Sequence, residues 1–128
     1  YEPPVHDFNL IDDETGDDIT YSVLSYDRVL LVVSYDLDKT DESNQQALND
    51  IAALAEKAGV PMYGLTASNY EAVNDFRHKN QNMFPFLTAD GTMLKTIIRS
   101  NPGLVYLEKG TVKGKWHSDD LPVYADIF

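Results

Sequence analysis

The hydrophobic residues of this chain gather in short runs that are separated by polar and charged segments. The clearest run lies in residues 28–35, where β-branched residues and leucines follow one another with almost no polar break. Such a run is typical of a central strand that is covered on both faces. Residues 5–11 and 19–24 instead alternate loosely between apolar and polar positions on either side of an acidic turn around Gly16. These two segments predict an N-terminal β-hairpin.

Residues 40–59 repeat their apolar positions at the spacing of a helix. Thr40 or Asp41 can cap the start of this helix, and Gly59 can end it. Its predicted apolar face consists of Leu48, Ile51, Ala55 and Ala58.

Residues 68–80 predict a second helix, in which Ser68 and Glu71 have the spacing of a capping box. The residues expected to face inward are Ala72, Val73 and Phe76. Shorter helical segments are predicted in residues 91–100 and 118–128.

Four further segments have the length and composition of strands: residues 60–67, 85–90, 103–108 and 111–116. Lys109 and Gly110 form a tight turn between the last two. Side chains predicted to share one face of the final strand are Val112, Gly114 and Trp116. Lys113 and Lys115 are expected on the other face, as on an edge strand protected against further pairing.

The order of these elements predicts an α/β fold. Strand–helix–strand units give parallel pairs through right-handed crossovers, whereas the final hairpin is antiparallel. We therefore expect one domain, residues 1–128, with a mixed sheet of about four to six strands flanked by helices.

Charge excludes some classes of partner. The chain carries 21 acidic and 10 basic residues, a net charge of −11. Residues 1–58 hold 14 acidic and 3 basic side chains, whereas residues 59–128 hold 7 of each. This excess repels nucleic acid and anionic lipid surfaces, so we expect neither as a partner. The chain also has no apolar run of the roughly 20 residues that a membrane helix needs, so we expect no direct insertion of this domain.

The sequence contains no cysteine, which excludes thiol redox chemistry and zinc–thiolate sites by this chain alone. It begins at Tyr1, without a signal peptide, and we interpret it as a part of a longer chain.

Several motifs near the end of the chain resemble those of one superfamily. Pro102 precedes an apolar strand that ends in an acid, and a glycine turn and a last strand follow in "GLVYLEKGTVKGKW". This order is similar to that of the thioredoxin-like superfamily, especially its peroxiredoxin and membrane-tethered thioredoxin branches. Residues 3–24 likewise resemble the start of peroxiredoxins, so the likeness covers nearly the whole chain. The resemblance implies a thioredoxin-like fold, with Pro102 at the position of the cis-proline beside the catalytic loop.

The same resemblance implies that the redox nucleophile is missing. Aligned with the peroxiredoxin loop, Asp36 takes the position of the proline, Thr40 that of the threonine, and Ser43 that of the reactive cysteine. Aligned with a thioredoxin Cys-x-x-Cys motif, Asp38 and Asp41 take the two cysteine positions. A serine hydroxyl needs a positioned general base, and no histidine is close in sequence. We therefore expect no catalysis and no cofactor.

Other functions of this loop stay open. Asp36, Asp38 and Asp41 could supply oxygen ligands to a divalent cation, although Asp41 and Ala47 occupy the positions where a calcium-binding EF-hand needs glycine and glutamate. An enzyme whose reactive group comes from another domain or from such an ion is thus one alternative. A purely structural spacer or oligomerisation domain is another.

The N-terminal start and the loop at residues 34–40 also resemble cysteine-free thioredoxin-like domains appended to bacterial DoxX-type membrane proteins. This resemblance implies a membrane-tethered protein with the domain on its extracytoplasmic, periplasmic face, the cytoplasmic side staying open. Since thioredoxin-like domains receive extended backbone beside the cis-proline, we expect a protein or extended peptide as partner. The predicted binding residues are Tyr35, Asp36, Asp38, Thr40, Asp41, Ser43, Asn101 and Pro102. The sequence does not indicate the oligomeric state.

Overall fold

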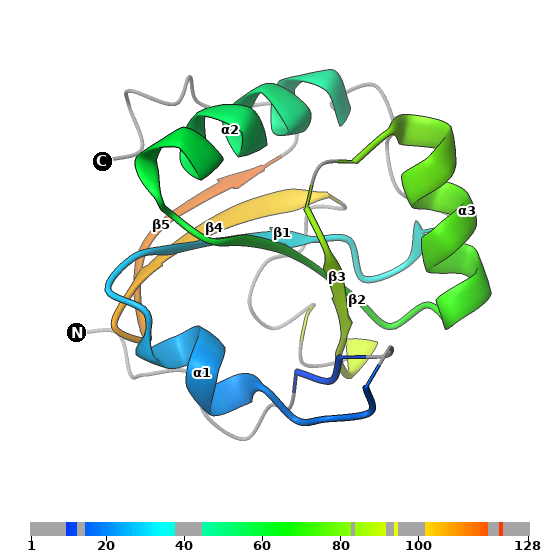
Figure 1. The fold of residues 1–128 in the computed structure, drawn as a ribbon, viewed down its shortest axis with the longest axis horizontal. Coiled ribbons are helices and arrows are strands. Elements are labelled where there is room, and N and C mark those ends of the chain that lie inside the picture. The colour runs from blue at the N-terminus through cyan, green and yellow to red at the C-terminus, as the bar shows by residue number, and fades with distance from the viewer. Residues whose placement is uncertain are drawn as a thin grey trace.

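A five-stranded mixed sheet forms the centre of the molecule (Figure 1). The computed structural model describes residues 10–12, 15–37, 45–82, 84–91, 94, 102–117 and 121. Its elements are α1 (Thr20–Ser25), β1 (Val29–Val33), α2 (Gln45–Ala58), β2 (Met62–Thr66), α3 (Tyr70–Asn80), β3 (Phe86–Thr88), β4 (Gly103–Glu108) and β5 (Thr111–His117). The strand order is β3-β2-β1-β4-β5, with β1, β2 and β3 parallel and β4 and β5 antiparallel to their neighbours. The predicted α/β fold with a mixed sheet is confirmed.

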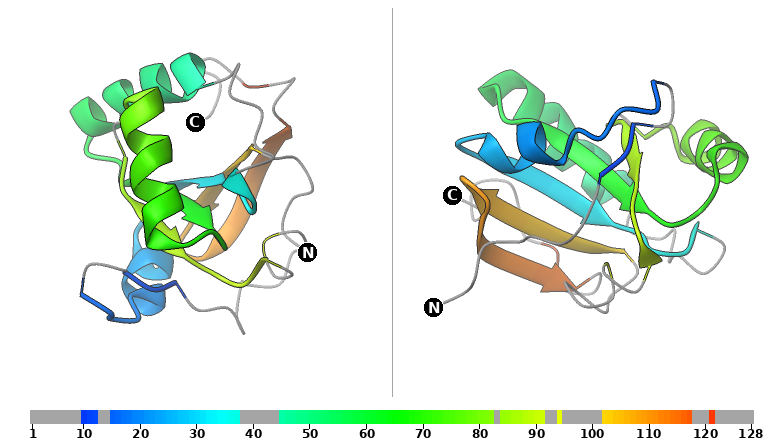
Figure 2. Two further views of the ribbon diagram at one scale, coloured as in Figure 1. Left: turned by 90° about the vertical axis from the view of Figure 1, so that its right-hand side faces the viewer. Right: turned by 90° about the horizontal axis from the view of Figure 1, so that it is seen from below.

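Strand β1 lies in the middle of the sheet, and all five of its residues are buried. Leu30 and Val32 belong to a core that α2 and α3 cover. Val29, Leu31 and Val33 belong to a second core on the opposite face, under α1. Figures 1 and 2 show α2 and α1 on opposite sides of the sheet. The uninterrupted apolar run of β1 is therefore explained by burial on both faces.

The prediction of a second hairpin strand in residues 19–24 is wrong, because these residues contribute to helix α1 and form no strand. The side chain of Asp18 accepts hydrogen bonds from the hydroxyl and from the backbone N–H of Thr20, the latter at 2.9 Å. These bonds support the start of the helix, and they lower the pKa of Asp18 below its ordinary value. An isolated antiparallel bridge joins Ile11 to Asp18, which the prediction had placed in the turn between the two segments.

Helix α2 ends at the predicted glycine. Gly59 has a positive φ of 75°. Its N–H donates to the carbonyl of Glu56 (3.1 Å), and the N–H of Val60 donates to that of Ala55 (2.9 Å). This pair of bonds is a Schellman motif, for which glycine is favoured because it adopts the left-handed conformation without strain. Ala58, expected on the buried face, is exposed at the end of the helix.

The cap of helix α3 differs from the expected one. The side chain of Asn69, and not that of Ser68, accepts the backbone N–H of Ala72 (2.8 Å). The capping box predicted at Ser68 and Glu71 is therefore wrong by one residue. The expected inward face is correct, since Val73 and Phe76 are buried and Ala72 packs against them as a partly buried neighbour.

The final hairpin turns at the predicted residues, because Lys109 and Gly110 both have positive φ, at 51° and 81°. The prediction that Val112, Gly114 and Trp116 share one face is wrong. The register of β5 against β4 shifts by one residue between Leu107 and Tyr106. A shift of one residue reverses the side chains that follow. Trp116 consequently packs against the core under α2 and α3, whereas Val112 packs against the opposite core.

Several predictions lie largely outside the described residues: the first segment of the hairpin, the cap of α2 at Thr40 or Asp41, and the helical segments at 91–100 and 118–128. Within the described ranges, none of the helices has the length and apolar character needed to cross a membrane.

Candidate functional site

The candidate site lies at the carboxyl end of β1, where the chain leaves the sheet. Ser34 is buried, and its N–H donates to the carbonyl of Leu65 in β2 (2.8 Å). One residue later, the carbonyl of Tyr35 accepts the N–H of Ala67 (3.3 Å). The segment after β1 therefore stays beside the segment after β2, and both end at the same edge of the sheet.

Pro102 lies at this same edge. Gly103 pairs with Val33 in the antiparallel register of β4 against β1. Continuing that register by one residue places Pro102, which is buried, opposite Ser34. The neighbourhood that the family resemblance implies for Pro102 and the end of β1 is thus present in the described part of the chain.

Of the predicted binding residues, Tyr35, Asp36 and Pro102 belong to the described residues, and all three belong to this edge. The other five lie outside the described residues, together with the peptide bond that precedes Pro102: Asp38, Thr40, Asp41, Ser43 and Asn101.

Ser68 has a role that its sequence pattern did not indicate. Its hydroxyl accepts the backbone N–H of Leu37 (3.1 Å), and its own N–H donates to the hydroxyl of Thr66 (3.1 Å). Ser68 therefore ties the segment after β1 to the segment after β2 instead of capping α3. The signal available in the sequence was the adjacent pair Ser68-Asn69, because both are good cap residues and only one can cap.

Two hollows include parts of the Tyr35–Leu37 segment in their linings. One, of about 330 Å³, is lined by Tyr35, Asp36, Ala67, Ser68 and Gly91. Its volume is at the lower end of the range of about 300–1,000 Å³ that sites for drug-sized ligands occupy.

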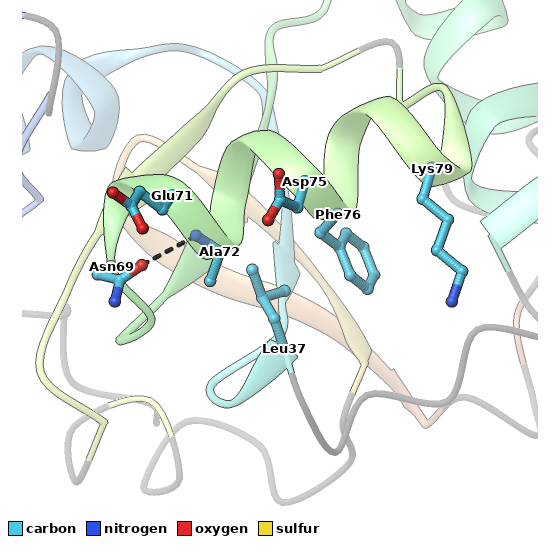
Figure 3. A pocket seen from close by; sticks show the side chains of 7 residues that line it. All are labelled: Leu37, Asn69, Glu71, Ala72, Asp75, Phe76 and Lys79. Atoms are coloured by element: carbon cyan, nitrogen blue, oxygen red, sulfur yellow. Dashed lines mark hydrogen bonds between the residues drawn. The ribbon is translucent and has the colours of Figure 1, made fainter.

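The other hollow, of about 460 Å³, lies between Leu37 and helix α3. Figure 3 shows Leu37 pointing toward the helix from below, opposite Ala72 and Phe76, with Glu71 and Asp75 following one another along the helix. We call this hollow the Leu37 groove. It combines an apolar floor with two carboxylates on its rim.

Helix α3 is held across this end of the molecule by buried amides. The side chain of Asn82 donates to that of Gln45 at the start of α2 (2.9 Å), and the side chain of Asn49 donates to the carbonyl of Asn80 (3.0 Å). Figure 1 shows the end of α3 beside the start of α2. These bonds link α2 to the end of α3, although the Nε2 atom of Gln45 and the Oδ1 atom of Asn82 are buried without a partner.

The described residues of this edge offer little for catalysis. The Ser34 hydroxyl is buried and has no hydrogen-bond partner, so no base activates it. His78 and His117 are exposed. Among the residues that the structure describes, no three histidine or carboxylate side chains gather to hold a metal ion. The divalent site suggested for Asp36, Asp38 and Asp41 stays a prediction, because two of its carboxylates lie outside those residues.

Searches with the sequence found no matching family model and no matching curated protein. The folded chain is similar to solved structures. The thioredoxin domain of a thiol-disulfide oxidoreductase from Bacteroides vulgatus matches with a TM-score of 0.72 and 12% identity, over 99% of this chain and 95% of that one. A PrxQ mutant from Xylella fastidiosa matches with a TM-score of 0.67 and 12% identity, over 98% and 89%.

The bacterioferritin comigratory protein of Xanthomonas campestris, described for alkyl peroxide reduction, matches with a TM-score of 0.61 and 18% identity, over 93% of this chain and 83% of that one. The similar structures thus include thiol-disulfide oxidoreductases and peroxiredoxins. At these identities the likeness shows the fold alone. The chain has a thioredoxin-like fold, and its sequence lacks the cysteine on which thiol redox chemistry depends.

Proposed function

We propose that this chain is a non-catalytic thioredoxin-like domain that binds a protein partner, as an extended peptide, at the carboxyl end of β1 beside Pro102. The observation that carries the proposal is the combination of a thioredoxin-like fold with a sequence that has no cysteine. Without a thiolate, the fold retains a surface beside the proline but no nucleophile. A role in binding a partner requires only the surface that is retained.

The edges of the sheet support this location for the partner. Strand β3 is short, and its Thr88 exchanges backbone hydrogen bonds with Ile11 (2.8 and 2.9 Å). Strand β5 presents exposed Lys113 and Lys115 and contains the register shift. Short, covered, charged or bulged edges resist the addition of a further strand. A peptide that pairs by its backbone is therefore better accommodated at the carboxyl end of β1.

Charge supports a partner with basic side chains. Asp36 borders the hollow beside Ser68, and the Leu37 groove is lined by two carboxylates, Glu71 and Asp75, and one cation, Lys79. A peptide that alternates basic and apolar residues would match both the carboxylates and the apolar floor of the groove.

A pair of synthetic peptides tests the proposal. We expect a peptide of alternating lysine and leucine to shift the backbone amide resonances of Tyr35, Leu37 and Gly103, and a peptide of alternating glutamate and leucine to leave them unchanged. Asp36→Asn should weaken binding of the lysine peptide, whereas the matched control Asp27→Asn, an exposed residue before β1, should not. Shifts that avoid the end of β1 would refute this site.

Enzyme assays test the non-catalytic part separately. Insulin disulfide reduction and peroxide consumption by the purified domain should equal the rates in buffer. Measurable turnover that survives added chelator would contradict the proposal outright, and turnover that depends on a divalent cation would favour the metal-assisted alternative.

The proposal extends to tethering of the domain on the extracytoplasmic face of a bacterial DoxX-type membrane protein. Its support is the resemblance of the N-terminal start and of residues 34–40. Protease accessibility of the full-length protein in intact spheroplasts measures the side: cleavage of the domain is expected, and protection would place it in the cytoplasm.

A further inference from the structure

A second, more enclosed pocket lies on the other side of α3, toward strand β3. Its volume is about 160 Å³, and its polar lining consists of Tyr63, Tyr70, Asn74, Arg77 and Asp12. Apolar side chains of α3 and β3, among them Val73 and Phe86, complete the wall. We call it the Arg77 pocket. It shares no lining residue with the Leu37 groove.

Arg77 is the unusual member of this lining. Its Nε atom is buried and has no hydrogen-bond partner. A guanidinium presents five N–H donors in a planar fork, which matches a carboxylate bidentately. Leaving such a donor buried and unpaired is unfavourable, and a bound anion would remove that cost.

Tyr63 supplies a hydroxyl that stays protonated at neutral pH. Burial, together with the neighbouring Tyr26 hydroxyl (O–O 3.4 Å), raises the pKa of Tyr63 to about 12. At neutral pH its hydroxyl is therefore uncharged and does not repel an anion. The rings of Tyr63 and Tyr70 also give the pocket apolar surface beside the charge.

Asp12 limits the charge of the ligand. Its carboxylate belongs to the same lining as Arg77, so a second negative group on the ligand would meet repulsion there. The volume is below the 300–1,000 Å³ or so that drug-sized ligands occupy. The lining thus favours a small molecule with one negative group and an apolar body.

We propose that the Arg77 pocket binds a small organic monocarboxylate, with its carboxylate on the Arg77 guanidinium and its apolar body against Tyr63, Tyr70 and Phe86. This site is independent of the peptide site proposed at the end of β1, and either can fail without the other.

Benzoate and its neutral isostere benzamide are suitable probes. Benzoate should raise the melting temperature of the domain saturably and should shift the amide resonances of Tyr63, Asn74 and Leu87; benzamide should do neither. Arg77→Gln, which keeps much of the side-chain length without the charge, should weaken the benzoate affinity at least about tenfold. The control Lys57→Gln removes an exposed cation from the end of α2 and should leave the affinity unchanged.

Three results would overturn the proposal: an equal response to benzamide, an unchanged benzoate affinity in Arg77→Gln, or resonance shifts outside the pocket. A response to inorganic phosphate without one to benzoate would also overturn it, because the carboxylate assignment would be wrong. If Arg77→Gln does not fold, two other measurements test whether benzoate binds in the pocket. They are the benzoate affinity of Tyr70→Ala, at a half-exposed position, and the resonance map of the unaltered domain.

Discussion

The two sides of helix α3 face different hollows. Toward the end of β1, the Leu37 groove has Glu71 and Asp75 above an apolar floor, near the end of the sheet at which the sequence resemblance predicted the binding residues. Toward β3, the Arg77 pocket holds a guanidinium whose buried Nε atom has no hydrogen-bond partner, two tyrosine rings and a smaller volume. The Leu37 groove borders the end of β1, whose position follows from the fold. The Arg77 pocket depends instead on individual side chains of this chain. Loss of the redox nucleophile therefore does not leave the molecule without candidate binding surfaces.

The largest expected effect comes from the side chain that anchors α3. Phe76 is buried in the floor of the Leu37 groove and meets Phe86 edge-to-face, with ring centroids 6.2 Å apart. Phe76→Ala should lower the free energy of unfolding by about 3–5 kcal/mol, because truncation of a buried aromatic residue leaves a cavity. Urea unfolding followed by circular dichroism measures the loss. A change below about 1 kcal/mol would mean that α3 is not packed as described.

The buried amides at the end of α3 come next. Asn82→Ala removes the donor to Gln45, whose own Nε2 already lacks a partner. We expect a loss of about 1–3 kcal/mol, the cost of leaving a buried polar group unsatisfied. Amide hydrogen exchange should accelerate at the start of α2 and at the end of α3 together. Acceleration in only one helix would show that the amides do not couple them.

Asn69 and Ser68 offer a matched pair at the start of α3. Asn69→Ala should lower the free energy of unfolding by about 1 kcal/mol because the cap is lost. It should affect the Leu37 groove and the Arg77 pocket equally. Ser68→Ala removes the acceptor of the Leu37 N–H, so it should disturb the Leu37 groove while the Arg77 pocket keeps its affinity for benzoate. Thermal unfolding and benzoate titration of both variants separate the two roles. If both variants gave the same results, Asn69 would not be the cap that distinguishes them.

The smallest effect at neutral pH concerns Tyr63. Its folded pKa of about 12 exceeds the ordinary tyrosine value of 10.0. The folded state therefore holds this proton more tightly, and the stabilisation is complete below pH 10 and is lost as the pH rises through 12. Tyr63→Phe should flatten the decline of the melting temperature in this window and change little at pH 7. If the melting temperature of Tyr63→Phe declined at alkaline pH as much as that of the unaltered domain, other groups would be responsible for the decline.

Local patterns were sufficient where a single segment carries its own constraint. The run in β1 indicated a strand buried on both faces, because a side chain must be apolar wherever neither face meets water. Gly59 and the pair Lys109-Gly110 indicated their turns, since few residues tolerate positive φ. The resemblance around Pro102 then indicated the thioredoxin-like fold.

Errors arose where a distant partner decided the outcome. Residues 19–24 alternate like a strand, yet Val23 is buried as part of α1 because its core partners lie in other elements. The hydroxyl of Ser68 accepts the backbone N–H of Leu37, so Asn69 and not Ser68 caps α3. The register shift in β5 depends on how that strand pairs with β4 and leaves no trace in the alternation of its own residues.

The sequence by itself determined the α/β class, the central strand, the acidic charge and the absence of a thiol, because each follows from residue types or from spacing along one segment. Only the tertiary structure brought Pro102 beside Ser34, joined Ser68 to Leu37, and enclosed Arg77 with Tyr63 and Tyr70. Those placements depend on contacts between residues far apart in the chain. Such contacts are selected by packing of the whole molecule, and no local periodicity records them.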